Sequence, residues 1–69
     1  MINVVSARYE PQLGGDVSGM VYIFTDGTAA AITDNGAFYA ETEDELWDEN
    51  FEDKIPGRYL DAIRRYSKN

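Results

Sequence analysis

Two dipeptides suited to tight reverse turns, Asp26-Gly27 and Asn35-Gly36, constrain this chain more than any other feature. Asp-Gly and Asn-Gly readily adopt the positive φ angles of the two-residue turn that joins neighbouring antiparallel strands. The segments around them are rich in β-branched and aromatic residues or in alanine. The sequence therefore predicts a three-stranded meander with strands over residues 18–25, 28–34 and 37–41.

The two turns also predict how these strands pair. A two-residue loop would place Thr25 opposite Thr28 and Asp34 opposite Ala37. One face would then carry Met20, Tyr22, Phe24, Ala29, Ala31, Thr33, Phe38 and Ala40. The other face would carry Val21, Ile23, Thr25, Thr28, Ala30, Ile32, Asp34, Ala37, Tyr39 and Glu41. On the first face large side chains flank central alanines, so we expect helices to pack there. We expect the second face to be covered partly by the N-terminal strand's side chains or by a partner.

The segments on either side of the meander complete the predicted fold. Residues 2–7 are rich in β-branched residues and predict a further strand, followed by a loop over residues 10–16 that contains proline and a glycine pair. Thr42 and Glu45 form a capping box that predicts an acidic helix, with Trp47 on its inner side. A second helix is expected to begin near Pro56 and to bury a stripe formed by Tyr59, Ile63 and Tyr66.

These elements predict one α+β domain that spans residues 1–69. Its antiparallel sheet of three to four strands, a β-meander with two tight hairpins, is followed by two C-terminal helices packed on one face. A domain this small has a marginal core unless its packing is efficient or it associates with another molecule.

The composition argues against an enzyme. The chain has no cysteine and no histidine, which removes thiolate chemistry, disulfides and the commonest general base and metal ligand. The acids near Gly36 do not have the spacing of a calcium-binding EF-hand loop, because Thr42 stands where that loop needs a glutamate. We therefore expect no catalytic residues, no metal and no cofactor.

The charge is strongly negative and unevenly distributed. The net charge is −7, with no lysine or arginine between Arg8 and Lys54. The segment over residues 41–53 contains eight acidic residues and no basic one. This balance argues against direct binding to nucleic acid and favours a basic protein partner.

The acidic segment is the candidate binding site. A row of carboxylates on a helix offers closely spaced negative charge, as a nucleic-acid backbone does, to an arginine- and lysine-rich groove. Alternatively, the row serves only to solvate a helix face. The residues assigned to partner binding are Glu43, Asp44, Asp48, Glu49 and Glu52.

In size and charge profile the chain resembles the small acidic proteins that bacteriophages encode to disable host defences, such as anti-CRISPR proteins and DNA mimics. The resemblance implies a non-enzymatic inhibitor in the host cytoplasm that blocks nucleic-acid binding by a host protein. The resemblance to anti-CRISPR proteins implies that this host protein is a CRISPR effector subunit. It implies no role for any individual residue.

Two other classes of function remain open. The chain could be a structural protein that self-assembles through an exposed sheet face or an unpaired strand edge. It could also be an accessory subunit of an enzyme that uses its aromatic side chains. No apolar run is long enough to span a membrane, and the N-terminal residues lack a signal-peptide pattern. We expect a cytoplasmic monomer or small homo-oligomer.

Overall fold

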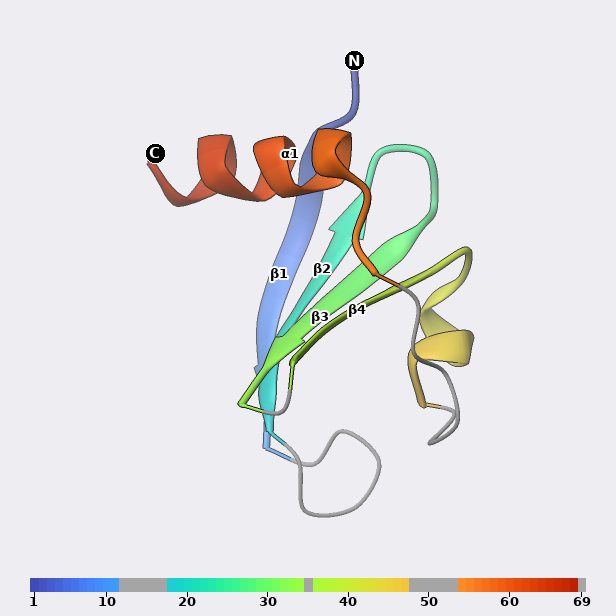
Figure 1. Cartoon of the computed structure of the whole chain (residues 1–69). Helices are drawn as coiled ribbons and strands as arrows, with labels where there is room; N and C mark the ends of the chain where they lie inside the picture. Colours follow the sequence, from blue (N-terminus) through green and yellow to red (C-terminus); the bar gives the residue numbers. More distant parts are fainter. Residues whose placement is uncertain (12–17, 35, 48–53, 69) are drawn as a thin grey trace.

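The computed structural model describes residues 1–11, 18–34, 36–47 and 54–68, with Trp47 described by its backbone only (Figure 1). In this part of the chain a four-stranded antiparallel sheet is followed by a short 3₁₀ helix and one α-helix. In chain order the elements are β1 (Val4–Glu10), β2 (Gly19–Phe24), β3 (Ala29–Thr33), β4 (Gly36–Ala40), η1 (Glu43–Trp47) and α1 (Gly57–Ser67).

The strands lie in the order β1-β2-β3-β4, so each strand pairs with its neighbour in sequence. The predicted α+β class and the antiparallel meander are confirmed. The first strand runs three residues beyond the predicted end at Ala7, to Glu10, and pairs with β2. A bulge at Val5 interrupts this pairing, because Val4 lies opposite Phe24 while Ser6 already lies opposite Ile23.

The predicted register of the first hairpin is wrong by one residue. Ile23 lies opposite Ala29, and the Phe24 amide donates a hydrogen bond to the Thr28 carbonyl at 2.9 Å. The loop therefore has three residues, not two, with Gly27 at a φ of 87°. Asp26 favours this loop because its carboxylate accepts a hydrogen bond from the Thr28 amide at 3.0 Å, as in a three-residue hairpin that ends in a glycine bulge.

The second hairpin is displaced by two residues from the predicted pairing of Asp34 with Ala37. Thr33 lies opposite Gly36, and Gly36 already belongs to β4 with a φ of 140°. The Thr33 hydroxyl donates a hydrogen bond to the Gly36 carbonyl at 2.9 Å. A shift of two residues leaves the side chains of β4 on their predicted faces relative to β3. The one-residue shift in the first hairpin, in contrast, exchanges the faces of both β3 and β4 relative to β2.

Helix α1 covers the sheet face that carries Tyr22, Phe24, Ala30 and Tyr39. The alanine beneath the helix is therefore Ala30, not Ala29 or Ala31 as predicted. The helix begins one residue after Pro56, which occupies the N-cap position. Its buried side chains are Tyr59, Ala62 and Ile63.

Aromatic rings join α1 to the sheet. The Tyr59 ring lies 4.8 Å from the Phe24 ring and 4.7 Å from the Tyr39 ring, measured between centroids. Further along the helix, Tyr66 meets Tyr22 edge-on at 6.5 Å. These contacts place the N-terminal half of α1 against β2 and β4 and its C-terminal end against β2.

The opposite face of the sheet is covered by η1, so the prediction of two helices on one face is wrong. Leu46 of η1 packs against Val21 and Ala31, and Ala29 and Ala40 are fully buried. The physical reason lies in the corrected register, which turns these alanines away from α1 and leaves a shallow, small-residue surface that a single short turn can cover.

Residues Glu43–Trp47 of the acidic segment form a five-residue 3₁₀ helix where the capping box predicted an α-helix. An α-helix that starts at Thr42 would place like charges four residues apart at Asp44 and Asp48 and at Glu45 and Glu49, which destabilises that conformation. Residues 48–53 lie outside the described part of the chain, as do the side chains of Trp47 and Phe51, whose burial was predicted.

Candidate acidic interface

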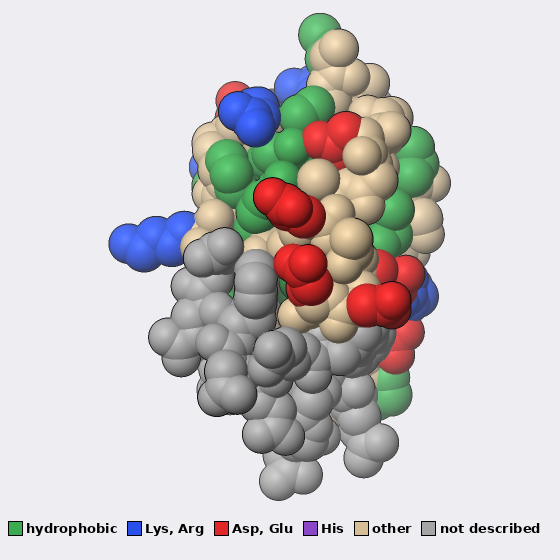
Figure 2. All heavy atoms as spheres, turned by 90° about the vertical axis from the view of Figure 1, so that its right-hand side faces the viewer, with side chains coloured by type: hydrophobic (Ala, Val, Ile, Leu, Met, Phe, Trp, Pro, Cys, Tyr) green, Lys and Arg blue, Asp and Glu red, His purple; other side chains and the backbone are tan. Residues whose placement is uncertain are grey.

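The acidic surface is built on the end of β4 and on η1. Glu41 follows β4 directly, and Asp44 and Glu45 lie in the turn of η1; all three side chains are exposed. Figure 2 views the molecule from the right-hand side of Figure 1, where η1 lies, and shows acidic side chains spread over the described surface and basic side chains toward its margins. We call these three residues the acidic surface.

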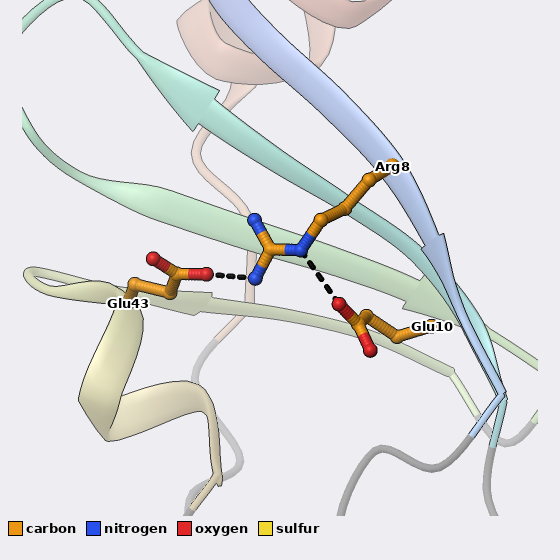
Figure 3. Close-up of polar contacts among 3 residues, drawn as sticks. All are labelled: Arg8, Glu10 and Glu43. Atoms are coloured by element: carbon orange, nitrogen blue, oxygen red, sulfur yellow. Dashed lines mark hydrogen bonds and ion pairs between the residues drawn. The ribbon is translucent and has the colours of Figure 1, made fainter.

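Glu43, one of the predicted partner-binding residues, is partly neutralised within the molecule. The Arg8 guanidinium reaches from β1 across the sheet and forms ion pairs with Glu43 through Nη2 and with Glu10 through Nε, the latter at 2.6 Å (Figure 3). All three side chains are part-exposed, so each pair contributes about 1 kcal/mol or less to stability. The geometry assigns Glu43 to holding η1 against the sheet more than to binding a partner.

The other predicted site residues have different outcomes. Asp44 is exposed, as a binding residue must be. Asp48, Glu49 and Glu52 lie outside the described residues. The prediction omitted Glu41 and Glu45, although both lie in the same acidic run and both are exposed.

A second polar cluster lies at the β2–β3 loop and was assigned only to turn formation from the sequence. The Asp26 carboxylate accepts hydrogen bonds from the Thr28 hydroxyl and from the Tyr59 hydroxyl of α1, both at 2.5 Å. The hydrogen bond from Thr28, and then that from Tyr59, lowers the pKa of Asp26 below its ordinary value of 3.8. Asp26 therefore ties the loop to the helix as a carboxylate.

Tyr39 lies beside this cluster. Burial raises the pKa of Tyr39 above 10.0, and hydrogen bonding with Tyr59 raises it further. The hydroxyl of Tyr39 therefore stays protonated at neutral pH. With one ionised carboxylate and neutral phenols, the cluster has the chemistry of a structural link between loop and helix.

The basic side chains lie mainly on α1. Arg58 stacks over the ring of Tyr59, with its guanidinium carbon 5.0 Å from the centroid. Arg64 pairs with Asp61 at 3.0 Å, and Arg65 donates to the Ile2 carbonyl at 2.5 Å. Among the described residues, basic side chains other than Arg8 and Lys54 therefore lie on α1 or directly after it.

Within the described residues, no group of three or more acidic side chains is arranged to hold a metal ion. In the same part of the chain no helix is long and apolar enough to cross a membrane. A shallow pocket lies between the start of β1 and the end of α1, lined by Asn3, Val4, Ala62, Arg65 and Tyr66.

A scan against protein-family models found no match, and searches of curated proteins and of solved structures found no significant similarity. The functional argument therefore depends on the chemistry of the surface described above.

Proposed function

We propose that this protein is a non-enzymatic inhibitor that binds the basic, nucleic-acid-binding surface of another protein, as DNA mimics and anti-CRISPR proteins do. The observation that carries the proposal is the acidic surface of Glu41, Asp44 and Glu45 in a chain of net charge −7. Its site of action is the cytoplasm of a host cell, where such partners work.

The acidic surface suits this role because its carboxylates are exposed and project from a short, tightly turned element. Closely spaced charge of one sign steers a charged partner and raises the association rate. Asp44 and Glu45 lie in η1, three and four residues after Glu41 at the end of β4. Asp48, Glu49 and Glu52 extend the same acidic run in the sequence and belong to the proposed binding segment.

The test is charge reversal on the acidic surface. The variant Asp44→Lys/Glu45→Lys should reduce the association rate with the partner at least tenfold at low salt, because the long-range attraction becomes repulsion. The partner is recovered by pull-down from the host and its nucleic-acid affinity is then measured with and without each variant. Wild type should displace the DNA or RNA, and the variant should not.

The control is Asp61→Lys, which makes half of that change in net charge, at one exposed residue of α1. This variant should bind the partner nearly as well as wild type. An equal loss of binding in both variants would show that net charge alone explains the effect. A partner that binds without salt dependence, or without competing with nucleic acid, would contradict charge mimicry.

A further inference from the structure

We propose that two copies of this chain associate through their β1 edges, joining two four-stranded sheets into one around a two-fold axis at Ala7. Strand β1 is the edge of the sheet in the described part of the chain. An edge strand offers unpaired backbone groups to another strand. The proposal is independent of the acidic surface and of the function proposed for it.

The backbone direction of β2 identifies which groups of β1 point outward. The Phe24 amide donates to Thr28 beside β3, while the Thr25 amide donates to Asn3 at the start of the chain, both at 2.9 Å. Successive residues of an antiparallel strand point their backbone groups to opposite sides. Odd-numbered residues of β2 therefore face β1.

Their partners on β1 are Ser6, Arg8 and Glu10, which lie opposite Ile23, Val21 and Gly19. The residues between them, Ala7 and Tyr9, consequently direct their amide and carbonyl groups away from β2. These groups are arranged to pair with a further antiparallel strand.

The strand is complementary to a second copy of itself. Ala7 is the middle residue of β1 and lies on the C-terminal side of the bulge at Val5, so an axis at Ala7 places Arg8 opposite the partner's Ser6. In that register Tyr9 lies beside the partner's Val5, at the bulge. These two side chains are 62% and 61% exposed in the single chain, so their contact would remove apolar surface from water. Ala7 leaves room at the axis for the two strands to approach.

Helix α1 ends where it can extend the contact. Arg65 is anchored to the Ile2 carbonyl, and Tyr66 lines the same shallow pocket as Val4. The end of α1 therefore lies beside the start of β1, next to the proposed contact.

An apolar row on the α1 side of the sheet supports the same arrangement. Tyr9, Met20, Ile32 and Ala37 lie side by side across the four strands, in the row beyond the one that α1 covers. Tyr9 is 62% exposed and Ile32 is 37% exposed. In the pair of chains the partner's Tyr66, itself 45% exposed, reaches the β1 end of this row.

The charge on β1 does not oppose this pairing. Charged side chains on an edge strand commonly prevent strand addition. The guanidinium of Arg8 is already bound to Glu10 and Glu43 on the opposite face of the sheet (Figure 3). In the proposed register it lies opposite the partner's Ser6, so no like charges meet.

The decisive experiment compares proline substitutions on the two edges of the sheet. Ala7→Pro removes an outward amide of β1 and leaves the β1–β2 hydrogen bonds intact. Ala37→Pro is the matched control, because the same reasoning gives Ala37 an outward amide on β4. Sedimentation equilibrium is measured from about 10 µM to about 1 mM, the range expected for a small interface.

Wild type and Ala37→Pro should dimerise, whereas Ala7→Pro should remain monomeric with an unchanged circular dichroism spectrum. Tyr9→Lys, a fully folded surface variant by its exposure, should weaken the dimer at least tenfold if Ala7→Pro does not fold. In a mixed-label sample, nuclear Overhauser contacts should join Tyr9 to Val5 of the other copy. A monomeric wild type, a dimeric Ala7→Pro or dissociation by Ala37→Pro would overturn the proposal.

Discussion

At the scale of single residues, Asp26 shows how one side chain can serve two purposes. Its carboxylate holds the Thr28 amide and hydroxyl within the β2–β3 loop, and it also accepts the Tyr59 hydroxyl from a helix 33 residues away in sequence. The loop and the helix are therefore stabilised by the same ionised group. This makes the stability of the fold sensitive to acid.

Replacing Tyr59 by phenylalanine should remove one of these bonds and keep the packing of the ring. Because the folded-state pKa of Asp26 is lowered, its contribution is present above 3.8 and disappears as the pH falls through the folded-state pKa. We expect Tyr59→Phe to cost about 1 kcal/mol near neutral pH, allowing for the exposure of Asp26. The difference from wild type should shrink from about pH 5 to about pH 2.5.

Urea unfolding monitored by tyrosine fluorescence at several pH values measures this effect. Tyr66→Phe is the control, because it makes the same change on the same helix at a residue that is not a hydrogen-bond partner of Asp26. A pH-independent difference for Tyr59→Phe would show that the bond to Asp26 does not stabilise the fold.

At the scale of elements, the sheet depends on a close approach at the start of β2. A Cβ atom built on Gly19 would lie 2.2 Å from the Ile32 carbonyl oxygen and 2.9 Å from the Thr33 Cα atom. Backbone atoms cannot move aside as a flexible side chain can. The pairing of β2 with β3 at this end therefore requires glycine.

Gly19→Ala should destabilise the protein by about 2 kcal/mol or more, because the strands must separate to admit the methyl group. Gly57→Ala is the control, since a Cβ at Gly57 meets nothing within 4 Å and alanine is favoured at the start of α1. Chemical denaturation of both variants measures the difference. Equal stabilities would mean that β2 and β3 do not approach as closely as described.

The elements also divide the charge of the molecule. The acidic surface lies on η1 and the end of β4, and the basic residues other than Arg8 and Lys54 lie on α1 or at its C-cap. The acidic residues of η1 and the basic residues of α1 therefore have different neighbours. Charge reversals on η1 can then be tested without changing the packing of α1.

At the scale of the whole molecule, the net charge of −7 implies two opposite responses to salt. Self-repulsion destabilises the compact state, and salt screens it. The melting temperature should therefore rise as sodium chloride increases from about 10 to about 200 mM, while binding to a basic partner weakens over the same range.

The neutral variant Glu41→Gln/Asp44→Asn/Glu45→Gln should show a smaller rise in melting temperature with salt than wild type does. Differential scanning calorimetry at fixed pH measures the rise. Asp61→Asn, which removes one acid from α1, is the control for a change in net charge away from the acidic surface. A melting temperature that falls with salt would contradict self-repulsion as the main electrostatic effect.

The sequence by itself determined the local features of the fold. The turn dipeptides Asp26-Gly27 and Asn35-Gly36 were sufficient for two hairpins in the right order, because their backbone preferences act within a few residues. Pro56 and the apolar spacing from Tyr59 onward predicted the helix and placed the start of α1 to within one residue. The acidic character of residues 41–53 required no structure at all.

Only the tertiary structure decided the register of the first hairpin and the division of the sheet into faces. The two-residue and three-residue loops differ by local hydrogen bonds such as that from Thr28 to Asp26, and the outcome also depends on how Tyr59 packs over Ala30. A one-residue change exchanged the faces and moved the acidic turn to the side opposite α1. The tertiary structure also decided which carboxylates form ion pairs within the chain, because the partner of Glu43 is Arg8, which lies 35 residues away in sequence, on β1.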